Sequence, residues 1–262
     1  MEGAFAVAGL VVGTAVGATG VGGGSLMTPI LILFYGISPA VAVGTDLLYA
    51  SISKAFGVAL HGRNGSVDWS IVGWMALGSV PAALLTLLLL REIEPGPALD
   101  RWIKLILAFA VVTTASFSLF QDRLLGLARR QPGGLAPARQ RQLTVLSGVL
   151  IGALVTFSSV GAGVIGMMVL LLLYPGQSPI RLVGSDLAHA VLITAIAGLG
   201  HAGLGTVDAS MLLWLLVGAL PGIYLGTRIA FRLDDRALKR LISGLLVFIG
   251  VTMAAKAIAA GS

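Results

Sequence analysis

The sequence has few charged residues and no cysteine, and each shortage excludes a class of protein. Only 11% of the 262 residues are charged, whereas a soluble domain carries about 25% charged residues. So few charges cannot cover a soluble protein of this size, which excludes the water-soluble enzyme classes and indicates an integral membrane protein. Because cysteine is absent, disulfides, thiolate metal sites and cysteine nucleophiles are excluded as well.

Apolar residues make up 57% of the chain and gather in runs long enough to cross a membrane. A helix needs about 20 apolar residues to span a hydrocarbon core of about 30 Å. The uninterrupted apolar runs that we predict to be membrane spans are 40–61, 69–90, 102–120, 180–201, 209–230 and 238–259. Two further apolar regions, 4–36 and 143–174, are interrupted by breaks rich in glycine and serine.

The chain repeats itself at a constant spacing of 140 residues. The letters GTDL at 44–47 match GSDL at 184–187, and Gly23 in the first break matches Gly163 in the second. Two structural repeats that meet at a site are a common transporter plan. The predicted halves are 1–120 and 143–262, and a basic linker, 121–142, joins them.

The positions of Lys and Arg favour inverted over parallel halves. If each interrupted region is a re-entrant hairpin, each half has three crossings and most basic residues lie on one side of the membrane. If each interrupted region crosses fully, the repeats are parallel and the two sides carry similar counts. We therefore predict an all-α integral membrane protein of two inverted repeats, with a broken first helix in each half and a cytoplasmic linker. The basic residues left on the other side are Arg91, Arg101, Lys104 and Lys256.

The two breaks are the strongest candidates for a binding site. Backbone that leaves the helix in hydrocarbon exposes polar groups that cost several kcal/mol each unless protein or water satisfies them. A helix restarts at about Ser25 and again at Val164, and free N–H groups at a helix start suit an anion. For Gly9, Gly13 and Gly17 the favoured reading is helix packing instead. The predicted substrate-binding residues at the breaks are Gly22, Gly23, Gly24, Ser25, Ser158, Ser159, Gly161 and Gly163.

Lys54 lies in the middle of the predicted span 40–61, with no acidic residue within one turn. A charged residue at that depth costs at least roughly 2.5–3.5 kcal/mol, so it faces the protein interior. It can bind a substrate anion, pair with Asp46 or a backbone carbonyl, or snorkel to the interface. We predict that Lys54 contributes to the substrate site.

Two polar pairs lie near the starts of equivalent spans: Thr45 with Asp46, and Ser185 with Asp186. The hydroxyls are predicted to bind substrate, and the carboxylates to carry a coupling proton or to cap their helices. His189, inside the second span, is a third coupling candidate because histidine titrates near neutral pH.

Two histidines at span ends are less informative. His61 precedes Asp68 by seven residues, and His201 precedes Asp208 by the same number. Each pair could shuttle protons, but a hydrogen bond that fixes the loop is the commoner arrangement. The spacing of the three histidines predicts no metal site.

The first break resembles a known family signature. Gly20-Val21-Gly22-Gly23-Gly24-Ser25-Leu26, followed by Pro29, Gly36, Ser38-Pro39 and Gly44-Thr45, is similar to the TauE/SafE sulfite exporter family of bacterial permeases. The second copy, Val160-Gly161-Ala162-Gly163 with Gly184-Ser185, fits the duplicated plan of that family. The resemblance implies a multi-pass protein of the bacterial inner membrane that moves sulfite, sulfoacetate or another small organic anion.

The function predicted from the sequence is secondary transport of a small organosulfur or carboxylate anion by alternating access at the repeat interface. The lipid bilayer, a coupling proton or sodium ion and a second copy of the chain are the expected partners, with no nucleic acid, cofactor or metal. No ATP-binding motif is present. The alternatives are a membrane-embedded enzyme that uses Ser185, Asp186 and His189, and a membrane scaffold without transport activity.

Overall fold

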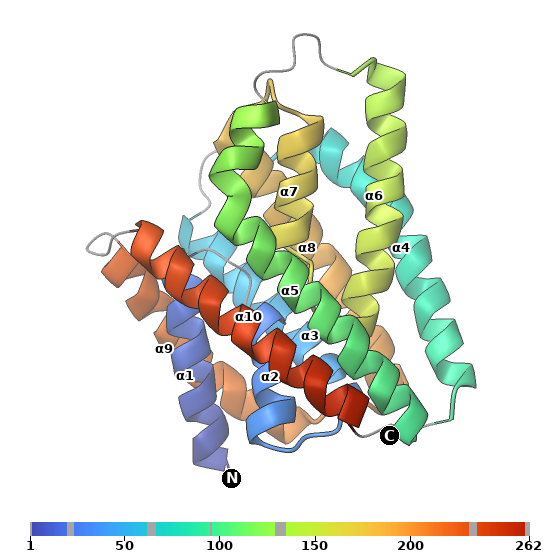
Figure 1. Cartoon of the computed structure of the whole chain (residues 1–262), viewed down its shortest axis with the longest axis vertical. Helices are drawn as coiled ribbons and strands as arrows, with labels where there is room; N and C mark the ends of the chain where they lie inside the picture. Colours follow the sequence, from blue (N-terminus) through green and yellow to red (C-terminus); the bar gives the residue numbers. More distant parts are fainter. Residues whose placement is uncertain are drawn as a thin grey trace.

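The described part of the chain is all helical (Figure 1). The computed structural model describes the backbone of residues 2–19, 24–61, 67–94, 96–128, 135–230 and 235–259, and the side chains of these except residues 19, 24–25, 57–61, 121–128, 179, 230, 235–242 and 258–259. The helices are α1 (Glu2–Thr19), α2 (Gly24–Phe34), α3 (Pro39–His61), α4 (Trp69–Glu92), α5 (Pro97–Ala128), α6 (Pro137–Ser158), α7 (Val164–Leu173), α8 (Pro179–Gly203), α9 (Ala209–Ala230) and α10 (Asp235–Ala259).

These helices confirm the all-α class and the broken first helix in each half. Five of them are long and apolar enough to cross a membrane: Trp69–Glu92, Pro97–Phe120, Pro137–Ser158, Ile180–Gly203 and Ala209–Ile229. The region predicted as the polar linker is largely helical, because α5 continues to Ala128 and α6 begins at Pro137. Proline at the first helical position costs no hydrogen bond, so Pro137 is well suited to start α6.

Each interrupted region folds into a hairpin whose two ends lie side by side. In the first, the Tyr35 hydroxyl donates to the Ala4 carbonyl at 2.8 Å. In the second, Gln140 Nε2 donates to the Leu173 carbonyl at 2.6 Å, and the hydroxyls of Thr144 and Tyr174 are 2.9 Å apart. Although α6 is long enough to cross a membrane, α7 thus returns the chain to the end where α6 began.

The two hairpins open toward opposite ends of the molecule (Figure 1). The α1–α2 hairpin opens toward the end where α1 begins, and the α6–α7 hairpin opens toward the end where α5 finishes. This arrangement is the one expected of inverted repeats with re-entrant first helices. The orientation of the chain in the membrane stays a prediction.

The first helix of each half packs closely, backbone to backbone, against a helix of the other half. Helix α1 lies along α9, and its counterpart α6 lies along α4. A Cβ on Gly9 or Gly17 would overlap the backbone of α9, and one on Gly222 would overlap the backbone of α1. The packing interpretation of the N-terminal glycines is confirmed, because only small residues allow helices to approach so closely.

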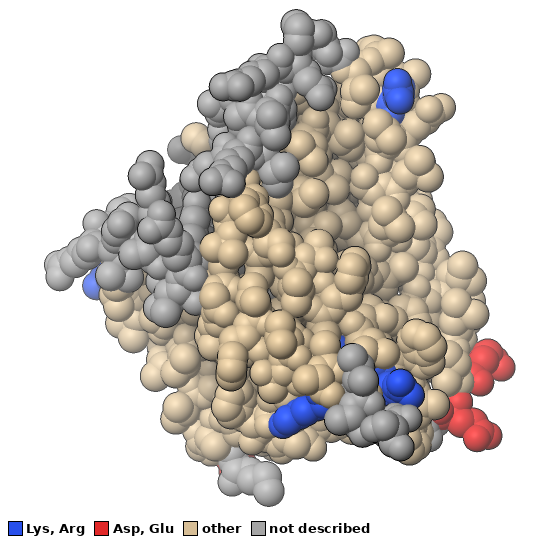
Figure 2. Space-filling model, in the orientation of Figure 1, with Lys and Arg blue, Asp and Glu red and all other residues tan. Residues whose placement is uncertain are grey.

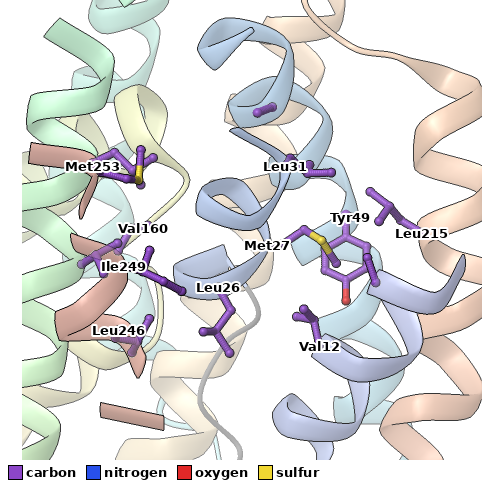
Figure 3. Close-up of a cluster of buried hydrophobic side chains, with 14 of the residues drawn as sticks. Val12, Leu26, Met27, Leu31, Tyr49, Val160, Leu215, Leu246, Ile249 and Met253 are labelled. Atoms are coloured by element: carbon purple, nitrogen blue, oxygen red, sulfur yellow. The ribbon is translucent and has the colours of Figure 1, made fainter. Parts of the chain in front are cut away.

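A buried apolar cluster fills the space around α2 (Figure 3). Met27 and Leu31 of α2 meet Tyr49 of α3 and Leu215 of α9, and all four side chains are fully buried. Leu26, on the same short helix, belongs to the cluster together with residues of α10. On the face shown in Figure 2, the described surface is mostly uncharged, and the Lys, Arg, Asp and Glu residues in view lie toward its margins.

The topology can be tested in this naturally cysteine-free chain by single-cysteine labelling. Ala138→Cys, before the second hairpin, and Arg228→Cys, at the end of α9, should react from the same side, which we predict to be cytoplasmic. Glu94→Cys, between α4 and α5, should react from the other side; all three positions are exposed. Labelling of Ala138→Cys and Arg228→Cys from opposite sides would rule out the inverted arrangement.

The α1–α9 contact makes a second prediction. A Cβ at Gly13 would lie 2.6 Å from the Ala219 carbonyl oxygen, so Gly13→Ala should lower the melting temperature in detergent, with an overpacking cost of about 1–3 kcal/mol. Gly73→Ala is the matched control, because a Cβ there meets nothing within 4 Å. Equal melting temperatures for the two variants would contradict the close helix contact.

Candidate functional site

The second break is a tight turn between α6 and α7 that requires unusual backbone angles. Helix α6 ends at Ser158, and Ser159 closes it in the left-handed conformation, with φ of 57° and its N–H bonded to the Val155 carbonyl at 2.7 Å. Gly161 and Gly163 have φ of 112° and 118°, angles that side chains disfavour. These glycines therefore serve the turn itself, whatever else the break binds.

The two serines of this turn differ in their availability. Ser158 Oγ donates to the Leu154 carbonyl at 2.7 Å, so its hydroxyl is held by its own helix. Ser159 is 2% exposed, and its Oγ has no hydrogen-bond partner. Of the two predicted ligands, Ser159 is the one whose hydroxyl is not bonded to its own helix, and it lies next to the Asp46 carboxylate.

Lys54 of α3 reaches the second break. Its side chain is 5% exposed, and Nζ donates to the Ala162 carbonyl at 2.7 Å. An ammonium has three donors, so this bond leaves Lys54 able to bind further acceptors. It also interacts electrostatically with Asp186 and, less strongly, with Asp46. A backbone carbonyl, one of the partners predicted for Lys54, therefore does accept a hydrogen bond from its ammonium.

Asp46 approaches the same turn from another side. It is fully buried on α3, and its Oδ2 accepts a short hydrogen bond from the Thr28 hydroxyl of α2. Its Oδ1 has no hydrogen-bond partner, although Ser159 lies close enough to interact with the carboxylate. The sequence did not single out Thr28; a hydroxyl in an apolar helix next to the first break was the available signal.

Asp186 and His189 lie on α8, on the Lys54 side of the site. A Cβ on Gly166, in the first turn of α7, would overlap Asp186 Oδ1, so the carboxylate lies directly against that turn. His189 is 1% exposed, and its Nε2 is 2.8 Å from Ser79 Oγ of α4. The turn is therefore surrounded by one buried ammonium and two buried carboxylates.

Thr45 and Ser185 do not point into this cluster. Thr45 Oγ1 accepts from the N–H of Asp208 at 3.0 Å, and Ser185 Oγ accepts from the N–H of Asp68 at 2.8 Å. Asp68 caps the start of α4, and Asp208 accepts from Met211 N–H at the start of α9. Each hydroxyl thus holds a helix start of the other half, a role that differs from the predicted substrate contact.

His201 fixes a loop and also satisfies the broken helix. Its Nδ1 is 2.8 Å from Thr206 Oγ1, and its Nε2 is 3.0 Å from the Thr156 carbonyl, in the last turn of α6. The sequence favoured a loop-fixing bond, which is present, although through Thr206. In the first half, His61 has no described side chain, and the same holds for Gly24 and Ser25 at the start of α2. Gly22 and Gly23 lie outside the described residues altogether.

The fold and site define a multi-pass membrane protein in which two broken hairpins meet buried charges, the architecture of a transporter. A match to the family described as Sulfite exporter TauE/SafE covers residues 5–253. The chain belongs to this family of membrane transporters.

Two relatives show how far the likeness extends. A probable membrane transporter protein, YjnA, of Bacillus subtilis is 36% identical over 253 residues, 94% of this chain and 96% of its own length. A probable membrane transporter protein of Xylella fastidiosa (strain Temecula1 / ATCC 700964) is 27% identical over 248 residues, 90% of this chain and 88% of its own. No solved structure matches the chain.

The contact between Thr45 and Asp208 can be tested by substitution. Thr45→Val leaves the Asp208 N–H without its acceptor and should destabilise the protein by about 1–3 kcal/mol, measured as a lower melting temperature. Thr194→Val is the control, because that buried hydroxyl bonds only carbonyls of its own helix. If both variants melt like the wild type, the hydroxyl of Thr45 does not hold α9.

Proposed function

We propose that this protein is a secondary transporter of a small anion, such as sulfite, sulfoacetate or another organosulfur or carboxylate anion. The observation that carries the proposal is Lys54, a buried ammonium bonded to the carbonyl of a broken helix. A neutral donor could satisfy the Ala162 carbonyl as well, so the use of a charged group at that depth favours a role beyond stability. We place the protein in the bacterial inner membrane, as the family resemblance implies.

The proposed anion site lies between Lys54 and the start of α7. The ammonium has donors beyond its bond to Ala162, and the unpartnered Ser159 hydroxyl is available on the same turn. The start of α7 at Val164 adds the positive end of a helix dipole. The glycine-rich first break, with Gly22, Gly23, Gly24 and Ser25, is proposed as the second contact by symmetry.

Alternating access then follows from the arrangement of the hairpins. Because they open toward opposite ends, an anion between the breaks can be reached from either side as the halves rearrange. Asp46, Asp186 and His189 are the groups proposed to couple this movement to a proton or sodium ion. A homodimer is a further expectation of the same proposal.

The arrangement does not favour the enzyme alternative. Its nucleophile would be Ser185, whose hydroxyl bonds the Arg181 carbonyl and the Asp68 N–H. Its base would be His189, whose Nε2 bonds Ser79 instead. Serine catalysis needs a nucleophile and base within hydrogen-bond reach of each other, so these residues support structural and transport roles.

A thermal-shift screen tests the proposal, with purified protein and sulfite, sulfoacetate, taurine, thiosulfate and acetate as ligands. At least one anion should raise the melting temperature of the wild type, because a ligand that binds only the folded state stabilises it. Lys54→Ala should lose about tenfold or more in affinity, since a hydrogen bond to a charged group contributes about 1.5–3 kcal/mol. Lys54→Arg should lose less.

The control is Lys256→Ala, at an exposed position near the end of α10, which removes the same charge from the surface of the protein. It should keep the shift of the wild type. An unchanged shift in Lys54→Ala would remove the ammonium from the anion site.

A further inference from the structure

The ammonium of Lys54 and the carboxylate of Asp186 lie against the same short segment at the second break. Lys54 Nζ donates to the Ala162 carbonyl at 2.7 Å. A Cβ on Gly166 would overlap Asp186 Oδ1, so that oxygen lies against the first turn of α7. The Gly166 N–H donates to the Gly161 carbonyl at 3.4 Å, so the two contact points are about one helix turn apart. Contacts with the backbone therefore place two opposite charges at one turn.

These opposite charges are close together without being paired. Lys54 and Asp186 interact electrostatically, but no hydrogen bond or ion pair in the described part of the chain joins them. Asp186 is 6% exposed, and its Oδ1 has no hydrogen-bond partner. Buried charges are normally paired or hydrogen-bonded. Both groups therefore have bonding capacity that the described residues do not use.

We infer that the substrate is a zwitterion, whose anionic group binds Lys54 and whose ammonium group binds Asp186. This assignment rests on the proposed anion transport and narrows the substrates to small anions that also carry an amine. Aminosulfonates and amino acids are the simplest compounds of this class. Asp186 then contacts the substrate instead of coupling an ion, and Asp46 and His189 remain the coupling candidates.

Both ends of a zwitterion match the groups at the turn. A sulfonate or carboxylate accepts hydrogen bonds, and Lys54 has donors beyond its bond to Ala162. A substrate ammonium donates, and Asp186 Oδ1 is a charged acceptor without a partner. Hydrogen bonds between charged groups are stronger than neutral ones. Because the contact points are about one helix turn apart, a compact substrate with two carbons between its charged groups suits the site.

A charge count favours a zwitterion over a simple anion. With both side chains ionised, Lys54 and Asp186 together carry no net charge, and a zwitterion leaves that sum unchanged. A simple anion would add a negative charge next to a carboxylate that already lacks a described donor. Net charge inside a membrane is costly, so the zwitterion is the cheaper occupant of the two.

Asp46 is less suited to bind the substrate ammonium, although it occupies the equivalent position 140 residues earlier. The Oδ1 atoms of Asp46 and Asp186 both lack a partner. However, Asp46 Oδ2 accepts from Thr28, and the Ser159 hydroxyl lies next to its carboxylate. No described hydrogen bond serves Asp186, which lies against the turn that Lys54 reaches. Asp186 is therefore the carboxylate with the greater need of a cationic partner.

Sulfonates of equal size test the inference on the unmodified protein. Taurine carries an ammonium group where propanesulfonate has a methyl group and isethionate a hydroxyl. In isothermal titration calorimetry, the purified wild type should bind taurine about tenfold or more tightly than propanesulfonate, because a hydrogen bond to a charged group contributes at least that factor. Isethionate should bind like propanesulfonate. For a carboxylate substrate, β-alanine and butyrate form the same matched pair.

Three variants assign the two ends of the substrate. Asp186→Asn should lose about tenfold in affinity for taurine, because the amide cannot pair with the ammonium, and should bind propanesulfonate at least as well as the wild type. Lys54→Ala should weaken both ligands by a similar factor. Asp46→Asn is the matched variant in the other half, and it should keep the preference for taurine over propanesulfonate. The comparison of ligands on the wild type decides the question even if Asp186→Asn does not fold.

The outcomes separate this inference from the proposed function. Equal affinities of the wild type within both ligand pairs would overturn the zwitterion and leave anion transport standing. A taurine preference that survives in Asp186→Asn, or is lost in Asp46→Asn, would place the ammonium elsewhere and overturn the inference as well. If the wild type binds none of these compounds and none of the anions in the thermal-shift screen, the proposed function fails, and the zwitterion with it.

Discussion

The structure depends on satisfying the backbone polar groups of a helix that ends inside an apolar bundle. At the second break the Ala162 carbonyl accepts from Lys54, and the Thr156 carbonyl lies within hydrogen-bond distance of His201. Both side chains come from helices that follow a hairpin, α3 and α8. Without these donors each carbonyl would be left unpaired, at a cost of several kcal/mol in hydrocarbon. The buried charge and the break therefore stabilise each other.

The hairpins keep their positions because each is packed on the opposite half of the chain. Helix α1 lies along α9 and α6 along α4, in contacts that leave no room for a Cβ at several glycines. The hydroxyls of Thr45 and Ser185 also link the halves, because each accepts a hydrogen bond from the start of a helix in the other half. A movement of one half would therefore act on the break carried by the other, as the proposed alternating access requires.

The two halves have equivalent helices, but the side chains at equivalent positions differ in their chemistry. Tyr49 and His189 occupy equivalent positions, yet Tyr49 lies in an apolar cluster with Met27 (Figure 3), whereas His189 bonds Ser79. Lys54 corresponds to Thr194, whose hydroxyl bonds only its own helix. The two halves therefore have similar helices but different side chains at equivalent positions, and the buried ammonium of Lys54 lies at the turn of the second break.

The sequence by itself determined the membrane class, the two breaks and most helix bounds, because apolar runs, glycine clusters and the 140-residue spacing are local or periodic signals. It did not give the extensions of α5 and α6 into the predicted linker. The sequence also selected Lys54, Asp46 and Asp186 as candidates for interior roles, since a charge in an apolar run has few stable locations, although capping and snorkelling remained open until the structure showed all three side chains to be buried. Only the tertiary structure decided which groups meet: Lys54 with Ala162, Asp46 with Thr28, and Thr45 with Asp208. These partners are separated by 108, 18 and 163 residues, and the packing of helices from both halves, which brings them together, leaves no periodic trace in the chain.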